Sequence, residues 1–545
     1  MSRTDTATGR ARDQEPLPRK ARKARKARKA AGASRAATLA LARAEGLRLP
    51  RHPAFLAALA LYLAQWGYAA FGAAGADRYP VLHDEDRYTQ IPLLLLAAGT
   101  LVAANLAALR GNRHGADRLY DVLVLAPWRR TLALLLATTT GAAVAVLLTA
   151  ARIAYLASRP GAVSAPSVAE LATGPALVLL AGVLGVLLAR LTRSMAAAPL
   201  TLAALGVLTV AGALRPTSGW RWLGLVAVED EFVPPMPSAL LDRPATAHLG
   251  YVLALVVLAS CWALSRGAAP RRAVSVALAL GLAAALTSGV VQVRSPGQDT
   301  LAARERAERE PATQQRCEHR DTVTYCAFPE FMPRVGEWET AVRGVLRRLP
   351  ASARRDGYAV RQHLFHDDTT NGVGTSPPLR TWARQDRAAG TPGAVPVGTD
   401  WGTGGLAGDR MLGFAAQFAV HALAGRTAGH APGVHAAPRC GGRAVAAMWL
   451  AAQATPELTE AYRSLRERAY GGLTVSTFDG AGGVSVSGPG ADVVSALLDR
   501  PQERTAAHVR EVWAELTARD TTTARAAELL DVPVPDGADE KAAGC

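Results

Sequence analysis

The chain has 545 residues, of which 50% are hydrophobic and only 19% are charged, so it is too apolar for a disordered protein. It carries 61 Lys and Arg against 45 Asp and Glu, a net charge of +16. Residues 1–52 contain 15 of these bases and only four of the acids, so most of the excess charge lies in the first tenth of the chain. The remainder is nearly balanced, and the charge therefore does not indicate nucleic-acid binding.

Lysine usage excludes one class of nucleotide site. A P-loop needs a lysine directly after a glycine, and none of the five lysines follows one. The sequence also lacks the HExxH pattern of zinc peptidases and the GxSxG pattern of serine hydrolases. We therefore predict that the chain is not an enzyme and has no metal or cofactor, and that any ATP-driven work takes place on a partner.

Residues 1–52 are predicted to form a basic cytoplasmic tail. An Arg-Lys-Ala repeat runs from Arg19 to Lys29. This repeat is consistent with a solvated tail or with attraction to anionic lipid, which contributes roughly 1 kcal/mol per basic residue near a membrane surface.

Residues 53–293 are predicted to be a transmembrane domain. A spanning helix needs roughly 20 apolar residues, and seven runs approach that length. Gln65 and Asn105 are the clearly polar residues at depth, and an interhelical hydrogen bond is the simpler interpretation of each. The predicted spans lie near residues 54–74, 91–109, 131–156, 172–189, 195–214, 248–264 and 273–293.

The loops between these runs predict the orientation. The second, fourth and sixth connections are rich in arginine, whereas acidic residues predominate in the others. Because basic residues accumulate on the cytoplasmic side, we expect the N-terminus inside and everything after Val293 outside. The predicted fold is thus an α-helical polytopic membrane protein with about seven transmembrane helices, followed by an extracellular mixed α+β domain.

Beyond the spans, residues 294–316 are predicted to be a stalk and residues 317–545 an extracellular domain. Cys317 and Cys326 bracket a short alternating strand in an oxidising compartment, which favours a disulfide between them. Cys261 lies in a span and reads as a small buried side chain, and no partner is favoured for Cys440 or Cys545. The elements expected in this domain include strands at 322–327 and 358–365, a helix at 336–349 and a hairpin at 473–487.

One cluster in the outer domain combines imidazoles with carboxylates. His363 and His366 precede Asp367 and Asp368. On a strand the two histidines would face opposite sides, so they are weak as joint metal ligands.

Two of the connections between predicted spans are longer than is needed to join neighbouring helices. The cytoplasmic one, residues 110–130, can form a short helix with Leu119, Tyr120 and Leu123 on one face, either to dock a partner or to rest on lipid headgroups. The outer one, residues 215–247, contains Trp220, Trp222 and a short apolar run. That run can enter the membrane as a re-entrant piece or lie at its interface.

These residues resemble the membrane subunits of actinobacterial ABC-type exporters. The stretches Arg113-His114-Gly115, Leu119-Tyr120-Asp121 and Pro127-Trp128-Arg129-Arg130 are similar to the coupling loop between the second and third spans of that family. The pieces Arg243-Pro244, His248-Leu249 and Tyr251 are similar to the entry of its sixth span. The resemblance implies a permease driven by a separate cytoplasmic ATPase and paired with a second permease protomer. It implies ATPase coupling through Arg113, Asp117, Leu119, Tyr120, Leu123, Arg129 and Arg130.

The seventh span and the outer domain are additions to that family's plain pattern. Cys317, Val323–Cys326 and Cys440 are similar to an extracellular extension of some actinobacterial permease-like proteins. The alternative function is therefore a membrane-anchored extracellular binding or sensing protein. A third is a membrane-anchored enzyme whose site these motifs do not reveal.

Overall fold

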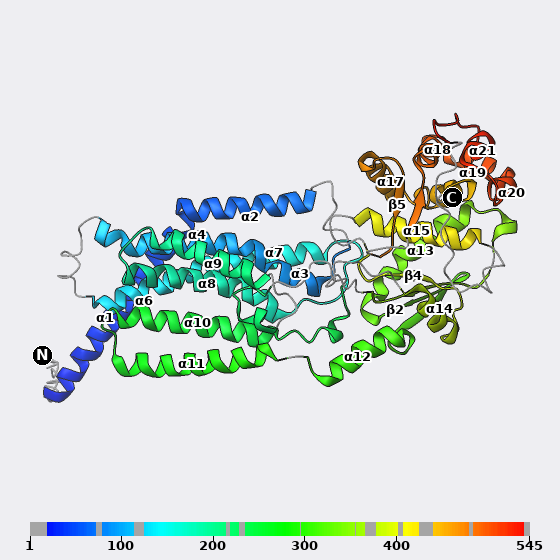
Figure 1. Cartoon of the computed structure of the whole chain (residues 1–545). Coiled ribbons are helices and arrows are strands. Elements are labelled where there is room, and N and C mark those ends of the chain that lie inside the picture. The colour runs from blue at the N-terminus through cyan, green and yellow to red at the C-terminus, as the bar shows by residue number, and fades with distance from the viewer. Residues whose placement is uncertain are drawn as a thin grey trace, which may run out of the picture.

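The structure is a computed structural model. It describes residues 19–71, 79–113, 125–213, 219–227, 235–294, 296–354, 356–365, 378–401, 407–424, 440–478 and 483–538. A long helical bundle and a C-terminal region, residues 296–538, lie end to end, and helix α1 (Arg19–Arg48) lies at the opposite end of the bundle (Figure 1). We call these two ends of the bundle the α1 end and the domain end.

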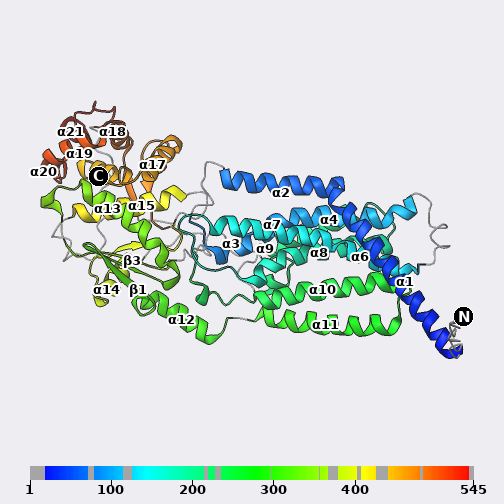
Figure 2. The same ribbon diagram turned by 180° about the vertical axis from the view of Figure 1, so that it is seen from behind.

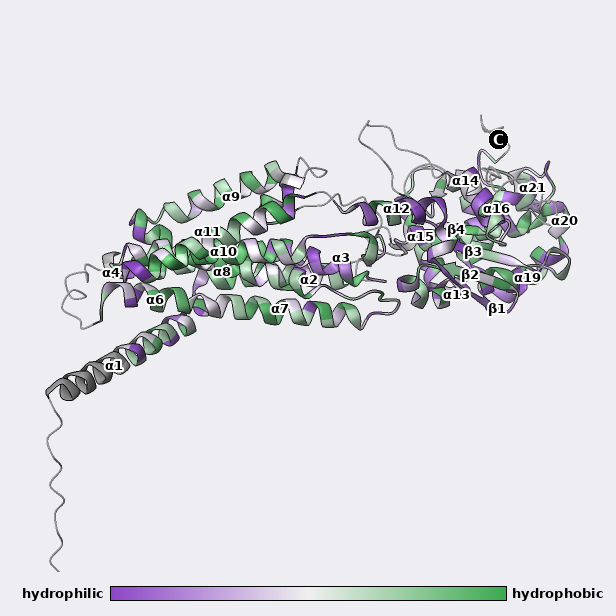
Figure 3. Cartoon of the chain, turned by 90° about the horizontal axis from the view of Figure 1, so that it is seen from below, coloured by the Kyte–Doolittle hydropathy of each residue, from purple (hydrophilic) through white to green (hydrophobic). Residues whose placement is uncertain are grey.

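Among the residues that the structure describes, six helical stretches are long and apolar enough to cross a membrane, which suggests a multi-pass membrane protein. Their hydrophobic colouring contrasts with the mixed colouring of the C-terminal region (Figure 3). Three of them consist of two consecutive helices. The six comprise α2 (Pro53–Phe71), α3 with α4 (Leu82–Tyr88, Gln90–Arg113), α6 with α7 (Pro127–Ala137, Thr139–Ala157), α8 (Val168–Leu191), α10 (Ala245–Ser265), and α11 with α12 (Arg271–Val293, Gln298–Arg309).

Six of the seven predicted spans overlap these stretches. The other, residues 195–214, corresponds to α9 (Ala197–Ala213), whose apolar part is only Ala197–Ala211. At about 1.5 Å per residue, this part is shorter than the roughly 30 Å hydrocarbon layer. By length and composition, the part of the chain that the structure describes therefore has six candidate spans, one fewer than predicted.

Helix α8 is the centre of the bundle. It is the most buried of the candidate spans and packs against α4 and α10. A Cβ atom at Gly185 would collide with the Leu101 carbonyl oxygen, so a glycine allows α8 and α4 this close approach. Asn105 donates from Nδ2 to the Gly185 carbonyl at 3.1 Å, which confirms the predicted interhelical hydrogen bond. Gln65, in contrast, is exposed.

Helix α1 occupies much of the segment predicted as a basic tail. Its C-terminal half packs against α6, and Ala42 is buried. Figure 2 shows α1 crossing the ends of the bundle helices before the 3-10 helix η1 (Leu49–Arg51) leads into α2. At least this half of α1 is therefore part of the folded structure.

The described part of the C-terminal region is mixed α/β, with two small sheets. The larger has strand order β1-β2-β3-β4, in which β1 and β2 are antiparallel and the remaining pairs are parallel. A two-stranded antiparallel sheet joins β5 and β6. The strands are β1 (Arg316–Arg320), β2 (Val323–Ala327), β3 (Tyr358–Gln362), β4 (Val395–Val397), β5 (Leu473–Val475) and β6 (Val484–Val486). The strands and hairpin predicted at 322–327, 358–365 and 473–487 are thus found.

Helices surround these sheets and share one hydrophobic core with them. Trp338 of α13, Trp449 of α16 and Tyr325 of β2 are fully buried in it. The helix predicted at 336–349 corresponds to α13. The helices are α13 (Val335–Arg348), α14 (Leu379–Ala388), α15 (Ala407–Leu423), α16 (Gly442–Ala452), α17 (Pro456–Arg468), α18 (Gly488–Leu498), α19 (Gln502–Glu511), α20 (Trp513–Leu516) and α21 (Thr523–Leu529).

The predicted disulfide between Cys317 and Cys326 is present. The two residues face each other in the antiparallel register of β1 and β2. Cys440 is also disulfide-bonded, and Cys261 has a free, buried thiol, as expected for a small side chain inside a span. Cys545 lies outside the described residues.

Candidate functional site

The α1 end carries the flanks of the predicted coupling loop. Arg113 ends α4, and Arg129 and Arg130 lie in the first turn of α6. The Arg129 guanidinium lies 4.8 Å from the centroid of the Trp128 ring, and Arg130 donates from Nε to the Leu125 carbonyl at 3.1 Å. Asp117, Leu119, Tyr120 and Leu123 lie outside the described residues.

Glu45 of α1 connects this end to the bundle. Its carboxylate accepts hydrogen bonds from Arg110 of α4 at 2.8 and 3.1 Å and from Arg48 at 3.0 Å. The side chain of Glu45 is 11% exposed, against 39% for Arg110 and 63% for Arg48. No sequence motif singles out this carboxylate, although Glu45 is the only acidic residue between Glu15 and Asp77.

The domain end contains a buried polar cluster that the sequence did not predict. Its acidic members, Asp86 and Glu170, belong to connections that the sequence predicts as outer, and neighbouring elements cover them. Each of the residues named next is less than 9% exposed. They are His83, Asp86 and Arg87 from α3, Gln90 from the start of α4, Glu170 from α8, His248 from α10 and Gln292 from α11.

Two carboxylates of this cluster join α3 and α4 to the start of α8. Asp86 accepts a hydrogen bond from the Ser167 main-chain N–H at 2.6 Å, and Gln90 donates from Nε2 to Glu170 at 2.6 Å. Ser167 caps α8 by accepting from the Glu170 N–H at 3.5 Å. Asp86 Oδ1 and Glu170 Oε1 have no hydrogen-bond partner among the described residues.

Further hydrogen bonds tie the segment after α9 to the bundle. Arg87 donates from Nε to the Ala227 carbonyl at 3.1 Å, and its guanidinium lies 4.7 Å from the centroid of the Trp222 ring. The ring nitrogens of His248 lie 3.2 Å from the carbonyl oxygens of Trp222 and Leu225.

The predicted apolar run lies in this same segment after α9. Trp222 is 5% exposed, and Val226 packs with Leu177 and Val252 of α8 and α10. The run therefore packs against the bundle, and Trp222 is buried there instead of facing lipid as an interfacial anchor.

Glu330 fixes the C-terminal region to this cluster. Its carboxylate accepts from the Ser164 hydroxyl at 2.5 Å and from the Ser238 N–H at 2.7 Å, and it lies 3.6 Å from His83 Nδ1. Burial raises the pKa of Glu330, but the nearby His83 and the hydrogen bonds from Ser164 and Ser238 outweigh it and hold the pKa at about 2. Glu330 is therefore ionised at neutral pH.

Arg334 makes a second attachment. It is fully buried and donates to the carbonyls of Thr399 at 2.6 Å, Tyr79 at 2.5 Å and Gly161 at 3.4 Å. Burial lowers the pKa of Arg334 to about 9, partly opposed by Asp400, so it stays charged at neutral pH. One side chain thus joins two loops of the bundle to the C-terminal region.

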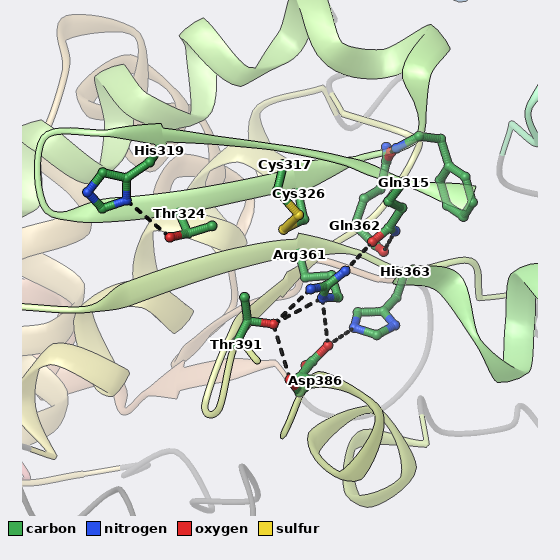
Figure 4. The surroundings of a disulfide bond; sticks show 11 residues. Gln315, Cys317, His319, Thr324, Cys326, Arg361, Gln362, His363, Asp386 and Thr391 are labelled. Carbon is green, nitrogen blue, oxygen red and sulfur yellow. Dashed lines mark hydrogen bonds and ion pairs between the residues drawn. A yellow bond between two sulfur atoms is a disulfide. The ribbon is translucent and has the colours of Figure 1, made fainter. Parts of the chain in front are cut away.

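Within the C-terminal region, a buried charged group lies beside the disulfide (Figure 4). Asp386 Oδ1 is 3.1 Å from Arg361 Nε and 3.2 Å from His363 Nε2, and Thr391 accepts from Arg361 at 2.9 Å. His363 also stacks on Trp382 with ring centroids 4.5 Å apart. Burial lowers the pKa of His363 and that of Arg361, and Asp386 opposes both shifts. These buried side chains bind one another, which indicates a structural role for the group.

Metal binding finds no support at this histidine. Among the residues that the structure describes, no group of three or more His, Cys, Asp or Glu side chains could hold a metal ion. His366, Asp367 and Asp368 lie outside the described residues.

The chain was compared with family models, with curated proteins and with solved structures. No family model, no curated protein and no solved structure matches this chain. The resemblance to exporter permeases therefore rests on the motif residues of the sequence.

Proposed function

We propose that the chain is the membrane-spanning permease subunit of an ABC-type exporter. A separate cytoplasmic ATPase would dock on the loop at residues 110–130, and a second permease protomer would complete the transporter. The observation that carries the proposal is that α4 and α6, which flank this loop, both contact α1 at the bundle end opposite the C-terminal region. Contacts with α1 hold the ends of α4 and α6 together, so a partner bound to the loop could act on both helices.

The contacts of α1 with α4 and α6 would transmit movement of the loop into the bundle. Arg110 lies in the last turn of α4, and its pair with Glu45 joins that turn to α1, which packs along α6. A push on the loop would reach α4 and α6 directly, because they flank it, and would reach α1 mainly through its packing on α6. Since α4 packs along α8, the centre of the bundle would follow.

The polar cluster would then carry that movement to the other end. Gln90 and Asp86 connect α4 and α3 to the start of α8, and Arg334 and Glu330 connect neighbouring loops to the C-terminal region. Packed and hydrogen-bonded elements of this kind can carry coupling between distant sites.

We further propose that the N-terminus is cytoplasmic and the C-terminal region is extracellular. The arginine-rich connections support this orientation. The two chain ends then lie on opposite membrane faces if α9 makes a seventh pass, and a helix shorter than the hydrocarbon layer can cross where the bilayer thins around it. The opposite positions of α1 and the C-terminal region in Figure 1 agree with that count.

Co-purification of the ATPase tests the proposal. Full-length protein purified from its own cells in mild detergent should recover a nucleotide-binding subunit. Replacing Tyr120 and Leu123 by Asp should lower that recovery at least about tenfold, because a few aromatic and aliphatic anchors usually dominate an interface. The control variant Asn112→Asp with Ala116→Asp adds the same charge to the same loop and should retain the subunit. Equal recovery with all three proteins would contradict the coupling role.

The attachment of the C-terminal region supports a second candidate, an extracellular binding or sensing protein. Ligand binding to that region could alter the bundle through Glu330 and Arg334. In that case the purified protein would carry no ATPase, and the loop variants would leave its behaviour unchanged.

A further inference from the structure

Two carboxylates are buried at the start of α8, at the domain end of the bundle. Asp86 of α3 is 0% exposed and Glu170 of α8 is 2% exposed. Asp86 accepts a hydrogen bond from the Ser167 N–H, and Glu170 accepts one from the side chain of Gln90, the first residue of α4. Ser167 is the N-cap of α8 and Glu170 lies in its first turn, so both carboxylates are bound at the same helix start.

The local sequence provides a different partner for Glu170. Ser167-Val168-Ala169-Glu170 is a capping-box pattern, in which the glutamate side chain accepts from the main-chain N–H of the serine. In the structure Asp86 takes that N–H, and Glu170 is bound by Gln90 instead. A helix start whose motif is suited to one carboxylate therefore holds two.

The charges of this pair are not balanced by an ion pair. Neither Asp86 nor Glu170 lies within ion-pair distance of a basic side chain among the described residues. Glu170 repels a negative charge on Asp86, and Arg243 and His83 attract it only from a longer distance. The basic side chains of this end are bound to other groups: Arg243 to Asp84, Arg87 to the Ala227 carbonyl, and His83 to Ser164 and Glu330.

The helix start itself compensates only part of the charge. The N-terminus of a helix is equivalent to roughly half a positive charge, whereas two ionised carboxylates carry two negative charges. A buried carboxylate without a counter-ion becomes neutral instead of remaining charged, because its ionised form is costly away from water.

We propose that Asp86 and Glu170 bind one proton between them at neutral pH. The proton has a place on Asp86 Oδ1 or Glu170 Oε1, the two oxygens that lack a hydrogen-bond partner among the described residues. It belongs to the pair, because two interacting acids titrate together. Ionisable residues inside membrane helices often mark such proton-binding positions.

The proton is linked to the contact between α3 and α8. If α3 moved away from α8, water would reach the pair and Glu170 would be able to close its capping box on Ser167. The O–H bond of the protonated acid would then break, and its proton would pass to water. The inference concerns the bundle alone and does not depend on transport, so its failure would leave the recovery of an ATPase unaffected.

Infrared spectroscopy of the purified full-length protein in detergent tests for the proton. A protonated carboxyl group absorbs at a higher C=O frequency than a carboxylate, and its band shifts in D₂O or when the acids carry ¹³C. We expect such a band at neutral pH, and we expect Asp86→Asn and Glu170→Gln each to remove it, because the remaining acid can then ionise alone. Asp84→Asn, the same change at an ion-paired acid of α3, is the control and should keep the band.

The pH dependence of thermal stability gives a second measurement. The folded pair holds a proton that the unfolded chain releases above about pH 4.5, so raising the pH favours unfolding. As the pH rises from 5 toward 8, wild type should lose stability relative to Asp86→Asn, with an unfolding constant that increases up to about tenfold per pH unit. Asp84→Asn should follow wild type.

Four outcomes would overturn the proposal. They are the absence of the band in wild type, its persistence in both neutral variants, its equal loss in Asp84→Asn, and stabilisation by sodium ions without the band, which would show that a metal cation balances the pair. The wild-type spectrum needs no substitution, so a variant that folds poorly does not remove the test.

Discussion

The two ends of the bundle hold their charged side chains in different ways. At the α1 end, Glu45 shares two guanidiniums that are substantially exposed to solvent. At the domain end, Arg87 is 7% exposed and Arg334 is fully buried, and both donate to main-chain carbonyls.

This contrast separates an exchangeable contact from a permanent one. Exposed ion pairs contribute at most about 1 kcal/mol and can be replaced by a pair with another molecule. A buried guanidinium on carbonyls cannot leave without stranding polar groups away from water. The α1 end is therefore suited to an exchangeable contact, whereas the domain end is suited to a fixed joint.

The largest expected effect concerns the membrane faces on which the two ends lie. In a chain with Cys261→Ala, a cysteine introduced at the fully exposed Tyr470 should react with a membrane-impermeant maleimide in intact cells. A cysteine at Gly32, where an added Cβ meets no atom within 4 Å, should react only after lysis. Labelling of both sites in intact cells, or of neither, would contradict seven passes and the proposed orientation.

The fixed joint should fail when its buried cation is removed. Arg334→Met keeps most of the side-chain volume but leaves the carbonyls of Tyr79 and Thr399 without their donor. We expect a loss of about 2–4 kcal/mol in the stability of the attachment, seen as faster limited proteolysis between bundle and C-terminal region. Arg316→Met, at an exposed position, is the control and should change the cleavage rate little.

The pH dependence of the joint should follow Glu330. Its pKa is about 2 in the folded protein against a usual value of 4.5, so it contributes stability that is fully present above about pH 4.5. That contribution is lost as the pH falls from 4.5 toward 2. After allowance for solvent screening, we expect roughly 1–2 kcal/mol.

The measurement is the melting temperature of wild-type protein and Glu330→Gln as a function of pH. The difference between the two should shrink as the pH falls below 4.5, while an exposed control, Glu308→Gln, should follow wild type throughout. A constant difference between wild type and Glu330→Gln down to pH 3 would show that the carboxylate charge is not the stabilising feature.

The sequence predicted features that depend on neighbouring residues. Spans of about 20 apolar residues are local properties, so six of them were located correctly. The disulfide between Cys317 and Cys326 was also accessible, because its partners are only nine residues apart and lie on one hairpin.

The sequence did not predict the buried polar cluster, because its partners are distant. Asp86 meets Ser167 and Gln90 meets Glu170 about 80 residues along the chain, and Arg334 meets Tyr79 across 255 residues. Viewed locally, Asp84-Glu85-Asp86-Arg87 looks like an ordinary acidic loop. Only the packing of α3 against α7 and α8 places part of it inside.

The smallest expected effect concerns the ion pair between Glu45 and Arg110 at the α1 end. Glu45→Arg should separate α1 from α4 by placing three arginines together, and adding Arg110→Glu should restore one pair in the opposite sense. Because the pair is partly exposed, we expect a coupling energy of no more than about 1 kcal/mol in a double-mutant cycle on thermal stability in detergent. The loss should decrease at high salt, since exposed charges are screened. A coupling of several kcal/mol that does not respond to salt would show that the α1 end is as firmly fixed as the domain end, and the distinction between an exchangeable and a permanent contact would no longer hold.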